Sequence, residues 1–104
     1  MSSSEVISPV FVSEKINTNF LNIVKIANFI SIFVGFKNSG TFNYGEKILE
    51  LPKKYKFKEQ VTIFNYKNIG LITIKNENYL SIASGSVLSS TQCYSQLLVP
   101  IFEV

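Results

Sequence analysis

The chain contains no histidine, tryptophan, aspartate or arginine, and only one cysteine among its 104 residues. These absences exclude histidine general-base catalysis, histidine-ligated metals, cysteine-rich zinc sites and arginine forks on phosphate. The single Cys93 cannot form an internal disulfide, so the fold needs no oxidising compartment, and we interpret this residue as a small hydrophobic side chain in a strand. The sequence therefore predicts no metal site and no cofactor.

Patterns that would indicate an enzyme are missing as well. Glycoside hydrolysis needs two carboxylates across a cleft, but the seven glutamates are scattered, and Glu46 and Glu50 bracket one short strand where we expect them to be solvated. Serine nucleophiles lack a histidine, a serine–lysine pair has no supporting motif, and the five glycines are too widely spaced for a phosphate loop. We therefore expect a protein that is not an enzyme.

Charge and targeting signals are weak. The ten lysines and seven glutamates give a net charge of +3, which does not indicate a nucleic-acid partner. The N-terminal Met-Ser-Ser-Ser-Glu lacks the pattern of a secretory signal, and polar residues interrupt the apolar stretch 20–36, so we expect no membrane insertion. Four lysines form a cluster that we interpret as a solvated loop and strand edge: Lys53, Lys54, Lys56 and Lys58.

The residues that are abundant favour β-structure in a single folded domain. Hydrophobic residues make up 46% of the chain and charged residues 16%, with thirteen isoleucines and nine phenylalanines. With a period of two, one face of the stretch 24–36 is apolar and is broken only at Asn28, while its other face is mixed but still apolar. We predict one long strand here, covered on both sides, because β-branched and aromatic residues dominate.

Short apolar segments separated by turn residues fill the rest of the chain. Strands are predicted near 48–51 (ended by Pro52), 61–66, 71–74, 79–82 and 97–104, with loops or turns at 38–45, 67–70, 75–78 and 83–86. This spacing predicts an all-β, jelly-roll-like antiparallel β-sandwich of seven or eight strands over 20–104, preceded by an N-terminal arm or first strand at 1–19. The predicted core includes Val24, Ile26, Ile30, Ile32, Ile63, Leu71, Ile74, Leu80 and Ile82.

The order of these features resembles a known family. The segment from Gly40 reads Gly-Thr-Phe-Asn-Tyr-Gly-Glu-Lys-Ile-Leu-Glu-Leu-Pro-Lys-Lys-Tyr-Lys-Phe, and Gly70-Leu71-Ile72-Thr73-Ile74 and a polar hairpin follow. With Leu51-Pro52 and Tyr55 as the anchor, it resembles the C-terminal head domains of phage tail fibres and baseplate receptor-binding proteins over about residues 22–84. The sequence departs from that family at Lys54, where glycine is usual, and at Lys56-Phe57, where a pair such as Arg-Pro often stands.

The resemblance implies a sandwich that is usually a homotrimer in the phage tail, where it contacts host cell-surface carbohydrate or builds the tail. Such a protein is made in the bacterial cytoplasm. A two-sheet sandwich covers only one face of a strand that is apolar on both faces, so the other face needs another subunit. Phe29 and Phe33 are our candidates for that subunit interface.

We expect ligand contacts in loops at one end of the sandwich, where the connections collect. A neutral or weakly anionic polysaccharide suits Asn, Tyr and Lys side chains, since the chain has no arginine for bidentate phosphate binding. Lys53 and Lys54 add long-range attraction to teichoic-acid-like phosphates, which salt screens. The candidate ligand-binding residues are Asn38, Asn43, Tyr44, Lys67, Asn68, Ser84 and Ser86.

Three functions stay open at this point: a receptor-binding head that contacts saccharide, a structural or assembly module of the same particle with no receptor, and a small phage-encoded protein that binds a host protein. The short chain favours the second, because receptor-binding proteins usually carry further parts before the head. The third is expected to show a strongly charged binding face, which the scattered charges do not provide. A glycan array separates the first function from the other two.

Overall fold

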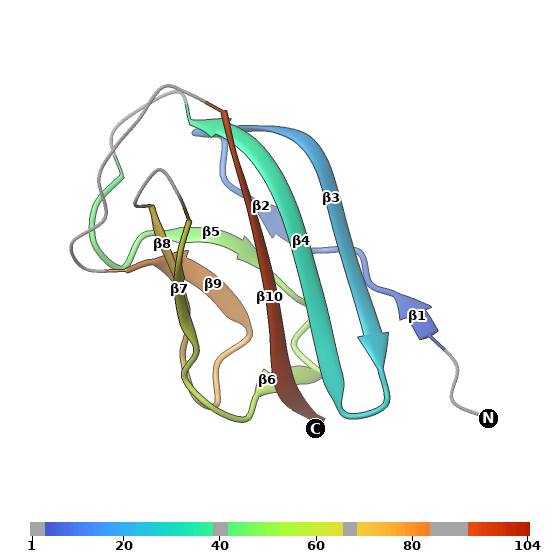
Figure 1. Ribbon diagram of the computed structural model, residues 1–104. Helices are drawn as coiled ribbons and strands as arrows, with labels where there is room; N and C mark the ends of the chain where they lie inside the picture. Colours follow the sequence, from blue (N-terminus) through green and yellow to red (C-terminus); the bar gives the residue numbers. More distant parts are fainter. Residues whose placement is uncertain (1–3, 39–41, 66–68, 84–91) are drawn as a thin grey trace.

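Two packed antiparallel β-sheets form the computed structural model, which describes residues 4–38, 42–65, 69–83 and 92–104 (Figure 1). The strand order is β1-β3-β4-β10-β6 in the first sheet and β2-β5-β9-β8-β7 in the second. The predicted all-β antiparallel sandwich is confirmed, although the described residues form ten strands instead of seven or eight. None of the described residues belongs to a helix that is long and apolar enough to cross a membrane.

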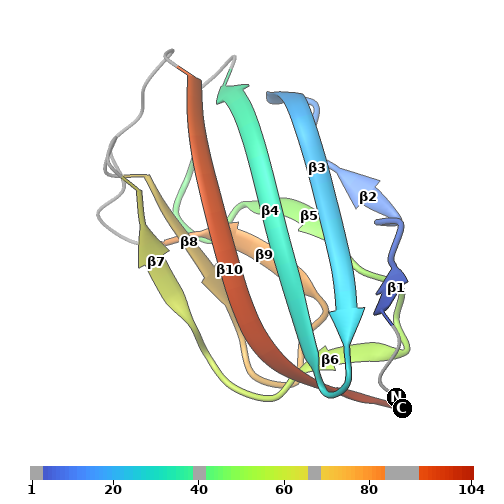
Figure 2. The same cartoon turned by 45° about the vertical axis from the view of Figure 1, so that its right-hand side comes forward.

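The strands of each sheet come from distant parts of the chain (Figure 2). The segment predicted as an arm or first strand supplies an edge strand to each sheet, since β1 pairs with β3 and β2 pairs with β5. The first sheet contains β1 (Ser4–Val6), β3 (Ile16–Ile26), β4 (Phe29–Asn38), β10 (Gln92–Glu103) and β6 (Tyr55–Phe57). The second contains β2 (Phe11–Val12), β5 (Lys47–Glu50), β9 (Tyr79–Ile82), β8 (Gly70–Thr73) and β7 (Thr62–Phe64).

A two-residue turn at Ala27 and Asn28 joins β3 to β4, so the single long strand predicted over 24–36 is wrong. Asn28, the polar break in the apolar pattern, belongs to this turn. Ala27 has a φ of 53°, a conformation that residues other than glycine and asparagine adopt rarely. An alanine is therefore a poor sequence marker for a hairpin, and the apolar residues on either side of it look continuous.

The hairpin moves two predicted core residues to the outside. Directly opposite residues of paired strands share a face of the sheet. Ile23 lies opposite Ile32 on the inner face, whereas Ile26 lies opposite Phe29 on the outer face. Val24 is half-buried and Ile26 is 44% exposed, so both core predictions are wrong.

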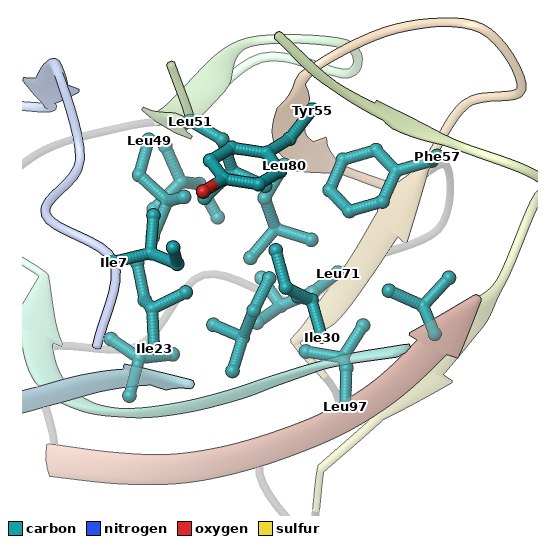
Figure 3. Packing of buried hydrophobic residues seen from close by; sticks show 14 of the residues in the cluster. Ile7, Ile23, Ile30, Leu49, Leu51, Tyr55, Phe57, Leu71, Leu80 and Leu97 are labelled. Carbon is teal, nitrogen blue, oxygen red and sulfur yellow. The ribbon is translucent and has the colours of Figure 1, made fainter. Parts of the chain in front are cut away.

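The core lies between the sheets, where alternate side chains of β4 and β10 meet those of β5, β8 and β9 (Figure 3). Ile30, Ile32, Leu71, Leu80 and Ile82 are buried as predicted, and Ile63 is half-buried against them. Further core residues that the sequence prediction did not include are Ile7, Ile23, Val34, Ile48, Leu49, Tyr55, Phe57, Ile69, Leu97, Val99 and Ile101.

A buried threonine explains the remaining wrong core prediction, which is Ile74. Thr73 occupies the inward position at the end of β8, so the next residue, Ile74, points outward and is 36% exposed. The Thr73 hydroxyl accepts a hydrogen bond from the Val61 N–H (2.9 Å) and donates one to the Glu59 carbonyl (3.1 Å). Because both of its hydrogen-bonding roles are satisfied, the hydroxyl is tolerated in the core.

The Leu51-Pro52-Tyr55 anchor of the resemblance has a structural role. Leu51 is fully buried, and the Tyr55 N–H donates to the Pro52 carbonyl (3.0 Å) in the turn that leads into β6. Tyr55 is only 1% exposed, and its hydroxyl donates to the Glu5 carboxylate (3.2 Å) at the edge of the first sheet. Its ring therefore closes one end of the core and does not reach a ligand (Figure 3).

Two backbone positions with positive φ give a matched stability test. Ala27→Gly is expected to raise the free energy of unfolding by about 0.5–1 kcal/mol, because relief of the left-handed strain outweighs the extra entropy of the unfolded chain. Gly45→Ala, at a φ of 83° with no atom within 4 Å of the added methyl group, is expected to lower it by about 1 kcal/mol. Urea denaturation measures both changes, and two changes of the same sign would contradict the assignment.

Candidate functional site

The outer face of the first sheet, on the side away from the core, is apolar. Pairing places Ile26, Phe29 and Pro100 in one row across β3, β4 and β10, and Val24 and Leu98 in the next, with Val6 beside Val24. We call these residues, together with others that alternate with core positions on the same strands, the outer apolar face: Val6, Val24, Ile26, Phe29, Phe33, Tyr94, Leu98, Pro100 and Phe102.

The exposure of this face is unusual for side chains of this kind. Val6 is 75% exposed, Leu98 63% and Phe29 45%, whereas their inward neighbours Leu97, Val99 and Ile30 are buried. The residues of this face span nine positions on β10, five on β4, three on β3 and one on β1. At about 3.3 Å along a strand and about 4.8 Å between strands, they give a footprint on the order of 300 Å². That is the size of the largest apolar patch on a typical monomer, which is often functional, so the face is a candidate contact surface.

The middle of the outer apolar face is also uncharged. Between the row of Asn22, Phe33 and Gln96 and the row of Ile26, Phe29 and Pro100, the described outward positions of β1, β3, β4 and β10 carry no Lys or Glu. Lys56, opposite Phe102 on β6, lies at the rim. A surface of this kind suits an uncharged, apolar counterpart.

Both residues predicted for a subunit interface lie on the outer apolar face. Phe29 and Phe33 are separated by one outward position on β4, and Phe33 is half-buried between its neighbours. The sequence argument did not identify Val6 or Leu98. The missed signal is the continuous apolar run along β10, since both its inward and its outward positions are apolar from Leu97 to Phe102.

The predicted ligand-binding loops are described only in part. Asn38 is the last residue of β4, opposite Ile16, and is therefore in a strand. Lys67, Asn68, Ser84 and Ser86 lie outside the described residues. Only Asn43 and Tyr44 are brought together by the structure, in a turn that precedes β5.

Glu46 braces this turn. Its carboxylate accepts a hydrogen bond from the Asn43 N–H (3.1 Å) and forms an ion pair with the Lys15 ammonium (2.9 Å). The Glu46 N–H donates to the Asn43 carbonyl (3.1 Å), and Gly45 has a φ of 83° and donates its N–H to the Ile82 carbonyl (2.9 Å). The turn is thus tied to the second sheet, while Tyr44 at its tip is 73% exposed.

The arrangement of carboxylates does not form a catalytic pair. Glu46 and Glu50, which we expected to be solvated, each form an ion pair with a lysine, Glu46 with Lys15 and Glu50 with Lys47 (2.7 Å). Over the described ranges, no three His, Cys, Asp or Glu side chains lie close enough to hold a metal ion.

Comparison with known proteins finds no matching family model, no matching curated protein and no matching solved structure. The function is accordingly inferred from the surfaces of the sandwich.

The ion pair at the turn predicts a pH dependence. The hydrogen bond from Lys15, followed by that from the Asn43 N–H, lowers the pKa of Glu46 below its usual 4.5. A carboxyl group with a depressed folded pKa contributes stability that is present above the unfolded pKa and is lost as the pH falls through the folded pKa. Glu46→Gln is expected to lower the free energy of unfolding at pH 7 by less than about 1 kcal/mol. It is also expected to make the free energy of unfolding fall less steeply as the pH drops below 4.5, because the variant has no carboxylate to protonate.

Urea denaturation at pH 7 and at pH 3 measures this effect. Glu59→Gln is the control, because Glu59 is exposed and its carboxylate has no ion-pair partner among the described residues. Equal pH profiles for the Glu46 and Glu59 variants would contradict the bracing role.

Proposed function

We propose that the protein is a non-catalytic assembly module that associates with further copies of itself through the outer apolar face, in the manner of the phage tail head domains that its sequence resembles. The observation that carries this proposal is the exposure of Val6, Ile26, Phe29 and Leu98 on one uncharged sheet face. The all-β sandwich agrees with the resemblance but does not by itself indicate a function.

A second copy of the chain fits this face better than a charged partner does. The middle of the face carries no charge, so two such faces meet without repulsion and without burying an unpaired ion. Apolar surface that association removes from water on either copy makes the free energy of association more favourable, by about 25 cal/mol per Å². Two footprints together bury on the order of 600 Å², which is the size of a weak or transient interface, so association is expected at micromolar or higher concentration.

The number of copies depends on what the outer apolar face meets. A face that packs against its own equivalent produces a two-fold dimer, whereas a face that packs against a different surface of the next copy closes a ring. The resemblance supports the closed trimer. Light scattering on the purified protein gives the number directly.

Association is expected to depend on Leu98. Leu98→Lys places a charge in the middle of the outer apolar face and is expected to shift the protein to monomer, raising the dissociation constant at least about tenfold. Val10→Lys is the matched control, because Val10 lies away from this face and is equally exposed, at 63%. Size-exclusion chromatography with light scattering at micromolar concentration is the measurement.

A monomeric wild-type protein at that concentration would overturn the proposal. An unchanged oligomer in the Leu98 variant would show that association uses another surface. Circular dichroism of both variants checks that the sandwich is intact.

Saccharide binding is a second candidate function, favoured by the turn that holds Asn43 and Tyr44. An aromatic ring that is 73% exposed on a hydrogen-bonded turn can stack on the apolar face of a sugar, and the neighbouring amide can bond to hydroxyls. The backbone hydrogen bonds of Gly45 and Glu46 fix the backbone of the turn before any ligand binds, so that only the side chain of Tyr44 has to be ordered on binding.

Tyr44→Ala and Asn43→Ala are expected to weaken saccharide binding on a glycan array by about fivefold or more, without lowering the melting temperature by more than about 2 °C. Tyr79→Ala is a control for the loss of a tyrosine elsewhere, because Tyr79 lies on β9 and is half-buried under the Lys47 side chain of β5. If no saccharide on the array binds the wild-type oligomer, the assembly role stands without a receptor.

A further inference from the structure

We propose that the pocket beside the β3–β4 turn binds a small ligand that carries one oxyanion, a carboxylate or a phosphate, on a body the size of a single sugar ring. This site lies apart from the Asn43–Tyr44 turn and was not among the sites expected from the sequence. Its lining residues are Lys25, Ala27, Asn28, Lys58, Ile101, Phe102 and Glu103.

Backbone hydrogen bonds hold the walls of the pocket together. The Ile101 N–H donates to the Asn28 carbonyl (2.8 Å), which ties the β3–β4 turn to β10. The Lys58 N–H donates to the Pro100 carbonyl (2.9 Å), which ties the segment after β6 to the same strand. Since both contacts exist before any ligand enters, the shape of the pocket is largely preformed.

The charges in the pocket are unbalanced in favour of an anion. Lys25 and Lys58 line it together with one carboxylate, that of Glu103. The Lys25 ammonium lies 3.8 Å from the Glu103 carboxylate, longer than a full charge-assisted hydrogen bond, so Lys25 keeps donors for a ligand. Lys58 is exposed, and its ammonium has no ion-pair partner within the described part of the chain.

The lysine cluster near β6 adds to this field. Lys53 and Lys54 are exposed in the turn that leads into β6, and Lys56 is on β6 opposite Phe102. The interpretation of this cluster as an edge agrees with the position of β6 at the edge of the first sheet. Lys54, which interacts electrostatically with Glu5 and Glu103, and Lys56 add positive charge at this end of the sandwich, and this charge increases the rate at which an anion arrives.

The remaining walls set the size and shape of the ligand. Phe102 is 37% exposed and offers an apolar wall, and the Asn28 side chain, which is also exposed, can donate and accept hydrogen bonds. The pocket volume is about 260 Å³, just below the range of ordinary small-molecule sites. This combination fits one ring with hydroxyl groups and a single anionic group, and it does not fit a long apolar molecule.

Three ligands with one ring test the proposal: glucuronate, glucose 6-phosphate and glucose. Titration of the 104-residue chain, followed by the amide resonances of Asn28, Lys58 and Phe102, is expected to give saturable shifts with at least one of the two anions and none with glucose. Which anion binds more tightly distinguishes a carboxylate ligand from a phosphate ligand. Equal shifts with glucose, or no saturation with either anion at millimolar concentration, would overturn the proposal.

Lys58→Ala is expected to weaken binding of the anion about fivefold, as loss of one charge-assisted contact implies. Lys75→Ala is the matched control, because it removes the same charge from an exposed lysine in the β8–β9 turn, outside the pocket. Equal weakening by both variants would show that only net charge matters and would refute the site. Neither lysine belongs to the outer apolar face, so neither substitution alters the surface proposed for self-association.

Discussion

The register of β3 against β4, set by the two-residue turn at Ala27 and Asn28, is the constraint on which the rest of the structure depends. A shift of one residue in a strand exchanges its two faces, so this turn decides that Ile23 and Ile30 enter the core and that Ile26 and Phe29 remain outside. The same turn lines the pocket and receives the hydrogen bond from Ile101. Core, contact surface and pocket thus follow from one local backbone geometry, which is held despite the positive φ of an alanine.

β10 pairs with β4 and therefore follows the same division into inward and outward residues. Its inward residues Leu97, Val99 and Ile101 close the core, and its outward residues Leu98 and Phe102 extend the outer apolar face. Pro100 interrupts neither role. It lacks an N–H, and its carbonyl accepts the hydrogen bond from the Lys58 N–H, so its nitrogen lies on the side of β10 away from β4, where no ladder bond is required. A strand that is apolar on both faces gains stability when its outer face is also removed from water, and this is the physical basis of the proposal of self-association.

The sequence predicted the class of fold well, because alternation and turn residues report local structure directly. The hairpin between β8 and β9 lies where the run from Lys75 to Asn78 indicated it, and Leu51-Pro52 ends β5 as expected. The position of the first hairpin could not be predicted, since an alanine in a left-handed conformation leaves no signal of its own. The inward position at the end of β8 was missed because a threonine occupies it, and the hydrogen bonds of its hydroxyl to Val61 and Glu59 make that burial favourable. Short strands with few apolar residues, such as β1 and β2, were also hard to recognise, because their stability comes from pairing with distant segments.

The candidate surfaces differ in how far a sequence can reveal them. The outward position of Phe29 and Phe33 could be predicted, because an apolar stretch with no polar face has apolar side chains outside the core as well as inside it. This holds even though the stretch forms two strands instead of one. The pocket could not be predicted from the sequence, since its lysines, asparagine and phenylalanine come from β3, the turn, the segment after β6 and β10, and only the assembled sheet brings them together.

Phe102 belongs to both the outer apolar face and the pocket. If copies associate through this face as proposed, a second copy also borders the pocket. The two proposals together then imply that binding of a ligand that packs against Phe102 and association of copies are thermodynamically linked, so that each changes the affinity of the other by the same factor.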